Sequence, residues 1–186
     1  MRWLRPGEPV SASALAQALA IPPHEVDELL AHSNLKSLTY TDDERRIVGF
    51  GGLAVRPMSH RFNLNGRRLY TWCAWDSLFI PVVLGQTAED ESPAPGGSGF
   101  VRLRVGPDRI ERIEPEGAVM TFLLPTAETF QADALKAMAS FCRYIFFFPD
   151  RDNAAAWTAR HPDTMLISMQ DAFELGRQTV AARWGR

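Results

Sequence analysis

The stretch RLYTWCAWDSLFIPVVL, residues 68–84, determines how we interpret this chain. Its first five residues have the β-branched and aromatic composition of a strand that enters a core. From Cys73 to Leu84 the sequence is strongly apolar and predicts a helix. Pro81 lies inside that segment and predicts a kink or a division, because proline removes a helical hydrogen bond. The stretch therefore predicts a strand followed directly by a buried helix.

Upstream of this stretch, residues 1–58 predict a small module of two helices and a hairpin. Residues 11–32 predict the two short helices, in which Ser11 or Ser13 can cap the first and Pro23 suits the first turn of the second. Segments 38–40 and 47–55 predict the hairpin, on either side of a polar turn. This order of elements indicates a winged-helix-like N-terminal module.

A winged helix raises the hypothesis of DNA binding, and the charges of the second helix argue against it. That helix would have to enter the major groove. It carries Glu25, Asp27 and Glu28 and, over residues 23–31, no lysine or arginine. Because attraction to phosphate supplies most non-specific affinity, an acidic helix opposes binding. We expect no nucleic-acid partner and interpret the module as a scaffold or a packing lid.

Downstream, residues 59–186 predict a core of strands and segregated helices. The predicted strands are 62–64, 68–72, 101–105, 110–113, 118–124, 141–148 and 165–169, with 141–148 buried on both faces. The predicted helices are 73–84, 132–140, 150–160 and 170–184. Residues 89–99, rich in Glu, Ser, Pro and Gly, predict a surface loop. We therefore expect an α+β fold, with a mixed or antiparallel sheet flanked by helices.

The overall composition limits the class of protein. A length of 186 residues suits one domain or one domain with a small appendage. No apolar run reaches the roughly 18 residues that a membrane span requires, and the start has no apolar signal core. The net charge of -2 gives no general attraction to DNA or anionic lipid. We therefore expect a cytoplasmic protein with no membrane partner.

The chain has two cysteines, Cys73 and Cys142. A reducing cytosol keeps such thiols free, and isolated cysteines are most often inert core residues. Cys73, however, would begin a helix, where unpaired amides and the helix dipole favour a thiolate. Asp76 lies three residues further on the same face. A thiolate and a carboxylate disfavour each other, so the pair can share one proton; a role for Asp76 as a cap or an exposed side chain is the alternative.

Cys142 opens the apolar segment 141–148, so the two thiols could converge in a dry pocket. Thiolates are the ligands that soft metals prefer. The four histidines have no ligand spacing and are expected to be structural or exposed: His24, His32, His60 and His161. Two thiols and one acid without histidine fit neither a typical zinc site nor a Cys–His hydrolase. Spacing alone therefore predicts a soft-metal or thiol site at Cys73, Asp76 and Cys142.

Residues 68–81 closely resemble the signature of the bacterial organomercurial (alkylmercury) lyase family. Further matches follow in order at residues 84–88, 140–142, 147–148, 156–157, 161 and 171–176. The resemblance spans about residues 7–178 and is most specific around the two cysteines. It implies that Cys73 and Cys142 are catalytic thiols that bind mercury and that Asp76 is the catalytic acid, which also lies at the metal.

The resemblance further implies the reaction, which is protonolysis of a carbon–mercury bond. The two thiols would take the organomercurial from a solution thiol, and Asp76 would deliver a proton to the mercury-bound carbon. A hydrocarbon would leave, and Hg(II) would stay on the two sulfurs. Mercury is then substrate and product, and no cofactor is expected. The implied partners are the organomercurial, cytosolic thiols and a mercuric reductase as acceptor of Hg(II).

A non-catalytic mercury- or copper-binding protein on the same fold is the alternative, since two sulfurs suffice to hold a soft metal. Asp76 favours catalysis, because storage has no use for a proton donor. Many members of the family carry a further cysteine where this chain has Ala94, and we expect that difference to affect stability more than chemistry. Several aromatic residues are expected either to line a water-free pocket or to pack in the core: Trp72, Trp75, Phe79 and the phenylalanines at 146–148.

Overall fold

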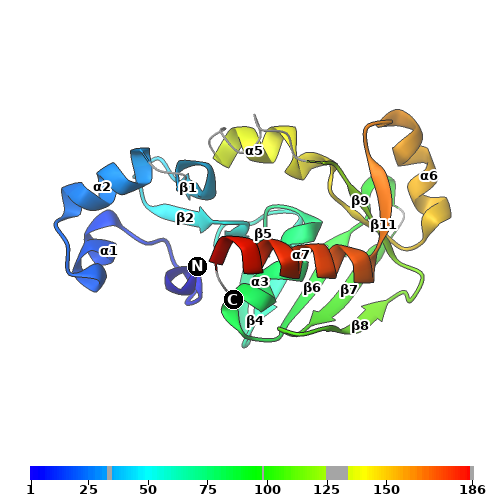
Figure 1. The fold of residues 1–186 in the computed structure, drawn as a ribbon, viewed down its shortest axis with the longest axis horizontal. Helices are drawn as coiled ribbons and strands as arrows, with labels where there is room; N and C mark the ends of the chain where they lie inside the picture. Colours follow the sequence, from blue (N-terminus) through cyan, green and yellow to red (C-terminus); the bar gives the residue numbers. More distant parts are fainter. Residues whose placement is uncertain (33–34, 98, 125–133, 185–186) are drawn as a thin grey trace.

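Two antiparallel sheets and the helices packed on them make up the fold (Figure 1). The computed structural model describes residues 1–186 with the exception of 33–34, 98, 125–133 and 185–186. The larger sheet has eight strands in the order β1-β2-β3-β5-β4-β6-β7-β8, and the smaller has three in the order β10-β9-β11. This architecture confirms the predicted α+β class with an antiparallel sheet.

Apart from β6 and the segment 141–148, the elements follow the predicted order. The strands are β1 (Thr39–Thr41), β2 (Ile47–Phe50), β3 (Leu53–Ala54), β4 (His60–Leu64), β5 (Arg67–Thr71), β6 (Ala88–Pro93), β7 (Phe100–Val105), β8 (Ile110–Glu114), β9 (Val119–Phe122), β10 (Phe147–Phe148) and β11 (Met165–Ser168). The α-helices are α1 (Ala12–Leu19), α2 (Pro23–His32), α3 (Ala74–Leu84), α5 (Ala134–Ser140), α6 (Arg151–Arg160) and α7 (Met169–Trp184). Short 3-10 turns are η1 (Arg2–Leu4), η2 (Lys36–Leu38), η3 (Pro95–Gly97) and η4 (Cys142–Tyr144). For the helix predicted at 132–140, residues 132–133 lie outside the described part.

α3 packs on one face of the larger sheet, and α7 packs along α3 (Figure 1). The inward positions of β4, β5 and β7 alternate with exposed ones, as the period of two in a half-buried strand requires. α3 is buried because it lies between this sheet and α7: the indole nitrogen of Trp75 donates to the carbonyl of Ala172, 3.0 Å away. The helix continues through Pro81 to Leu84 as one element, so of the two predicted effects of proline the division was wrong and the kink stays a prediction.

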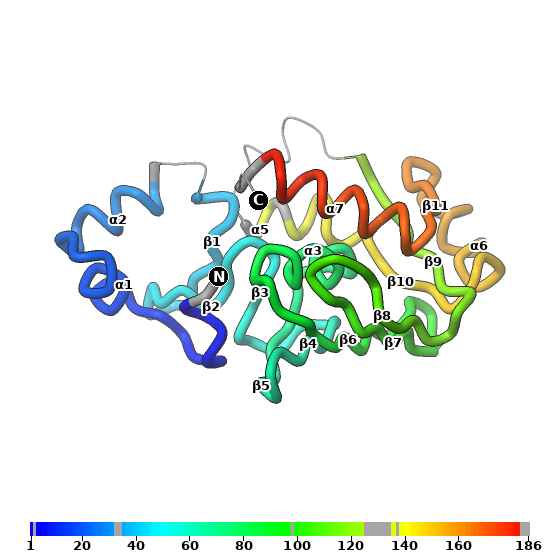
Figure 2. Tube along the Cα trace, turned by 60° about the horizontal axis from the view of Figure 1, so that its bottom comes forward, coloured from blue at the N-terminus to red at the C-terminus, as the bar shows by residue number. Residues whose placement is uncertain are grey.

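The N-terminal segment lies at one end of the molecule (Figure 2). Ser11 caps α1 by accepting the amide hydrogen of Ala14 at 3.1 Å, and α2 begins at Pro23, both as predicted. β1 and β2 form the predicted hairpin. The sheet does not end there, because β2 pairs with β3 and β3 pairs with β5 of the core. The winged-helix assignment and a domain boundary at residue 58 stay predictions.

The prediction of a surface loop at 89–99 was wrong for its first half, which is β6 in the middle of the larger sheet. Polar composition suggested a loop, but the polar residues alternate in direction. Glu89 and Glu91 point outward and form ion pairs with arginines of the neighbouring strands, whereas Asp90 and Ser92 are buried. No helix in the described part of the chain is long and apolar enough to span a membrane.

Candidate active site

Cys73 is the N-cap residue of α3, immediately after β5. Its backbone is extended (φ -147°, ψ 173°), which turns the chain from strand to helix. The amide of Cys73 donates to Oδ2 of Asp76 at 2.8 Å, the backward contact of a capping box. The sequence thus folds locally so that a thiol and a carboxyl share the first turn of one buried helix, as predicted.

Cys142 lies in the turn η4, and the prediction of one strand over 141–148 was wrong: only Phe147–Phe148 pairs as a strand. The reason is Thr121 of β9. Its hydroxyl donates to the carbonyl of Tyr144 at 2.9 Å and accepts the amide hydrogen of Phe146 at 3.0 Å, while its amide donates to the carbonyl of Phe146 at 2.9 Å. The side chain therefore takes the place of one of the two backbone hydrogen bonds that a strand pair would form here. The turn points Cys142 inward and leaves Arg143 exposed, with its guanidinium over the Tyr144 ring.

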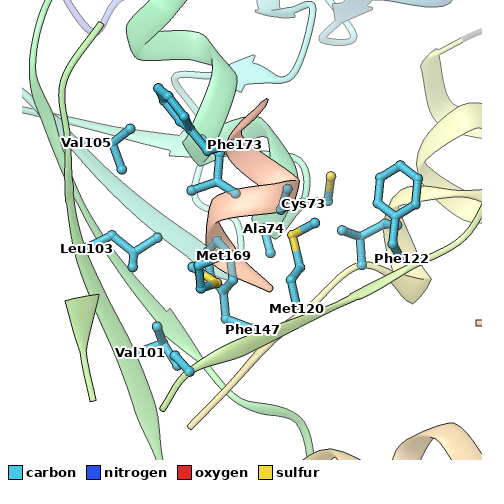
Figure 3. Packing of buried hydrophobic residues seen from close by; sticks show 14 of the residues in the cluster. Cys73, Ala74, Val101, Leu103, Val105, Met120, Phe122, Phe147, Met169 and Phe173 are labelled. Atoms are coloured by element: carbon cyan, nitrogen blue, oxygen red, sulfur yellow. The ribbon is translucent and has the colours of Figure 1, made fainter. Parts of the chain in front are cut away.

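The two elements bring the three predicted residues together. One ligand atom of each of Cys73, Asp76 and Cys142 lies within 4.8 Å of the other two. The amide of Ala74, in the first turn of α3, donates to the carbonyl of Ile145 at 3.4 Å and ties the helix to the turn. Both cysteines are free thiols. Figure 3 shows Cys73 among apolar side chains that come from β7, β9 and α7.

Burial controls the protonation of this group. The exposed fractions are 0% for Cys73, 6% for Asp76 and 8% for Cys142. Desolvation raises the pKa of Asp76 to about 7, although hydrogen bonds from Cys73 oppose the shift. Desolvation also raises the pKa of Cys73 well above its usual range, and the neighbouring Cys142 thiol and Asp76 carboxylate add to the rise. The group therefore holds protons at neutral pH and releases them when a metal replaces them on sulfur.

Gly52 makes room for the acid and was not predicted from the sequence. A Cβ atom built on Gly52 would lie 2.4 Å from Oδ1 of Asp76, and its φ of +96° is one that other residues rarely adopt. The carbonyl of Gly52 also accepts the amide hydrogen of Trp72 at 2.8 Å. Its one sequence signal is the Gly51-Gly52 pair between two short apolar segments.

An aromatic cluster packs around the site, with a different membership from the predicted one. Trp75, Phe122 and Phe141 form edge-to-face pairs with ring centroids 5.1 to 6.4 Å apart. Of the predicted phenylalanines, Phe147 belongs to the core cluster that contains both cysteines. Phe146 and Phe148 pack instead in a second cluster with Ala94 and Trp157. Trp72 is half-buried at the cysteine cluster, as predicted.

Other polar residues behind the site were also missed. Thr71, Ser77 and Asp90 are buried under the first turn of α3 and are joined by hydrogen bonds. Asp90 could not be found from sequence, because it stands in a segment whose composition is that of a loop. His60 is buried and hydrogen-bonded to Ser92, which agrees with the structural role expected for it.

Two buried thiols and one buried acid on an α+β fold form a group with the ligands that soft metals prefer and a carboxyl beside them. Residues 53–181 match the family model of alkylmercury lyase. The chain is 35% identical over 181 residues to the alkylmercury lyase of Staphylococcus epidermidis, covering 97% of this chain and 79% of that protein. It is 35% identical over 182 residues to the alkylmercury lyase of Streptomyces lividans, covering 98% of this chain and 80% of that protein. The chain belongs to the alkylmercury lyase family.

A solved structure supports the fold. The crystal structure of the mercury-bound form of MerB2 superposes with a TM-score of 0.79 at 21% identity, covering 95% of this chain and 84% of that one. At this identity the likeness concerns the fold alone. Because it covers 95% of this chain, the two proteins share the overall fold.

Proposed function

We propose that this alkylmercury lyase cleaves carbon–mercury bonds with Cys73 and Cys142 as the mercury-binding thiols and Asp76 as the proton donor. The observation that carries the proposal is that one ligand atom from each of these three residues, which come from two separate elements, lies within 4.8 Å of the other two. Two sulfurs this close can bind one soft ion, and the carboxyl lies beside both of them. The substrate is an organomercurial cation carried on a thiol, and mercury stays as product.

The difference in exposure between the two cysteine residues supports an order of steps. Cys142 is 8% exposed and Cys73 is fully buried, so Cys142 reacts first with an incoming organomercurial. A sulfur–mercury bond forms, and the carrier thiol leaves with the proton of Cys142. Cys73 then coordinates the same mercury. Its proton passes to the carboxylate of Asp76, which already accepts a hydrogen bond from the Cys73 amide.

Protonolysis follows from this arrangement. Electron density from the second sulfur makes the mercury-bound carbon more basic, and Asp76 donates its proton to that carbon. The carbon–mercury bond breaks as the carbon–hydrogen bond forms, and Hg(II) remains on two thiolates. Charge and protons balance without an external oxidant or reductant. General acid help of this kind typically contributes roughly 10²–10⁴-fold, and a pKa of about 7 suits an acid that must be recharged at neutral pH.

Storage of a soft metal without turnover, with mercury or copper as the ion, explains the sulfurs but not the acid. A buried carboxyl beside two thiolates repels the thiolate charge and would weaken simple metal storage. Asp76 therefore favours the lyase.

We further propose that the enzyme works in the cytoplasm, where abundant thiols deliver the organomercurial. The remaining expectations follow from the chemistry. The reaction needs no cofactor, because mercury itself is the electrophile. The product is held by two buried sulfurs, so a dithiol acceptor such as that of a mercuric reductase, or excess small thiol, is required to remove it.

The proposal is tested by incubating the purified protein with phenylmercury and excess thiol and measuring benzene. We expect Cys73→Ser, Cys142→Ser and Asp76→Asn to lower benzene release by at least roughly 10²-fold. Asp108→Asn is the matched control, because Asp108 lies in an exposed turn. Tight Hg(II) binding by the wild-type protein without benzene release would support the storage protein instead.

The order of thiol exchange has a test of its own. Mass spectrometry of acid-quenched samples should show phenylmercury captured by Cys73→Ser, which retains Cys142, at close to the wild-type rate. Capture by Cys142→Ser should be much slower. The opposite ranking would reverse the order of steps and leave the activity itself untouched.

A further inference from the structure

A line of buried polar side chains runs under α3 and is not used in the chemistry above. Its centre is Asp90 of β6, which is 4% exposed. Oδ1 of Asp90 lies 2.7 Å from Oγ of Ser77, and Oδ2 lies 2.5 Å from Oγ of Ser92. Oγ of Ser92 in turn lies 2.7 Å from Nδ1 of His60 on β4, which is 2% exposed. The line therefore joins two strands of the sheet to the helix.

The same line continues from Ser77 to the backbone of Cys73. Oγ of Ser77 lies 2.9 Å from Oγ1 of Thr71, which lies 3.0 Å from the carbonyl oxygen of Cys73. Thr71 and Ser77 are fully buried. A carbonyl oxygen can only accept, so the Thr71 hydroxyl is the donor in that last contact.

Counting hydrogens along the line fixes its direction. There are five contacts, and each needs one hydrogen. The threonine, the two serines and the Nδ1 of the imidazole supply four, and an ionised carboxylate supplies none. A Thr71 hydroxyl shared between two acceptors would make up the deficit only by weakening its bond to Cys73. All five contacts are hydrogen bonds if Asp90 carries a proton on Oδ1 and donates it to Ser77.

We propose that Asp90 is a neutral carboxylic acid that directs a one-way series of hydrogen bonds from His60 to the carbonyl of Cys73. We propose that this hydrogen-bond series holds the Cys73 sulfur in its reactive position. In order, His60 donates to Ser92, Ser92 to Asp90, Asp90 to Ser77, Ser77 to Thr71, and Thr71 to Cys73. The series ends on a carbonyl, which cannot pass a proton on. Thr71, Ser77 and Asp90 are therefore positioning residues and not a proton pathway.

The surroundings of Asp90 agree with a protonated acid. Desolvation raises the pKa of Asp90 to about 7 and lowers the pKa of His60 to about 4, so both groups are neutral in mildly acidic solution. The facing residue of β7 is Leu103, which is apolar. The other acids on β6, Glu89 and Glu91, point to the opposite face of the sheet; Glu91 pairs with Arg61 and Arg102, and Glu89 with Arg104. No cation in the described ranges pairs with Asp90.

The hydrogen-bond series acts on Cys73 because it supplies the second of two hydrogen bonds that hold the backbone of that residue. Asp76 accepts the amide hydrogen of Cys73, and Thr71 binds its carbonyl oxygen. With both ends of the N-cap residue held, the direction of its Cα–Cβ bond toward Cys142 is fixed. A reacting group displaced by about 1 Å can cost on the order of 10²-fold in rate. Loss of one restraint should cost less than this.

The first test uses Thr71→Val and Thr71→Ser and rests on the proposed function. Valine keeps the shape of threonine and removes the donor, whereas serine keeps the hydroxyl. With phenylmercury and excess thiol, we expect Thr71→Val to lower kcat on the order of ten-fold with little change in KM, and Thr71→Ser to retain most of it. Equal loss in the two variants, or no loss in Thr71→Val, would overturn the positioning role.

The second test addresses the proton on Asp90 and does not require turnover. Asparagine reproduces a protonated aspartic acid, with an amide donor toward Ser77 and an oxygen acceptor toward Ser92; valine reproduces neither. At pH 6 the infrared spectrum of the wild-type protein should contain a protonated-carboxyl band that disappears in Asp90→Asn and persists in Asp76→Asn. Asp90→Asn should also keep the wild-type kcat within about two-fold, while Asp90→Val loses on the order of ten-fold.

The two proposals can fail separately. If wild-type protein releases no benzene, the lyase proposal fails. The infrared band and the Hg(II) affinities of Thr71→Val and Thr71→Ser then still test the hydrogen-bond series. If wild-type protein is active but no band is lost in Asp90→Asn, the neutral acid is refuted. If Asp90→Asn loses as much kcat as Asp90→Val, the one-way series is refuted.

Discussion

Replacing Asp76 with asparagine should abolish benzene release and also stabilise the folded protein above neutral pH. The reason is the burial of the carboxyl, which raises its pKa from the ordinary 3.8 to about 7 in the folded state. Asparagine keeps an oxygen that can accept the Cys73 amide hydrogen, so the contact at the start of α3 is preserved. It removes only the titration.

The sign follows from the direction of the shift. Between about pH 4 and pH 7 the folded protein binds a proton at Asp76 that the unfolded chain has released, so stability falls as pH rises through this window. Below it the full stability is present, and above pH 7 the loss levels off. The rise in pKa from 3.8 to about 7 corresponds to a contribution of at most about 4 kcal/mol to the free energy of unfolding. About 2–3 kcal/mol of this contribution is lost between pH 5 and pH 8.

Urea unfolding followed by far-UV circular dichroism, with thiols kept reduced, measures the effect. The free energy of unfolding of Asp76→Asn, relative to wild type, should increase by about 2–3 kcal/mol from pH 5 to pH 8. Asp108→Asn, in an exposed turn, should show no such change. A difference that stays constant with pH, or grows toward acid, would refute the raised pKa.

Two further substitutions test close approaches that the structure depends on. Gly52→Ala puts a Cβ 2.4 Å from the Asp76 carboxyl and should lower benzene release on the order of 10²-fold. Gly66→Ala, also at positive φ but with nothing within 4 Å, should lower the free energy of unfolding by about 1 kcal/mol and leave activity unchanged. Equal activities in the two variants would contradict this account. Gly176→Ala brings a Cβ to 2.9 Å from that of Phe79 and should lower the free energy of unfolding by about 1–3 kcal/mol through the α3–α7 packing; a wild-type urea midpoint would show that the helices separate freely.

The sequence predicted the site better than it predicted the sheet. Cys73 and Asp76 belong to one helical turn, so local spacing was enough to place them on the same face. The strand-to-helix order of residues 68–84 and the N-terminal caps were likewise local. β6 was missed because its inward Asp90 and Ser92 are stabilised by partners on α3 and β4, which no property of the segment itself reveals.

By itself, the sequence determined the class of fold, the helix that begins at Cys73, and the pair of a thiol and an acid in its first turn. These are properties of neighbouring residues, and periodicity and capping express them directly. Only the tertiary structure decided that Cys142 meets that pair, because a side chain on β9 turns residues 142–144 away from the strand that their apolar composition favours. Tertiary packing also decided that Asp76 is buried from solvent and therefore holds a proton near neutral pH, since desolvation depends on what surrounds a carboxyl in space and not on its neighbours in the chain.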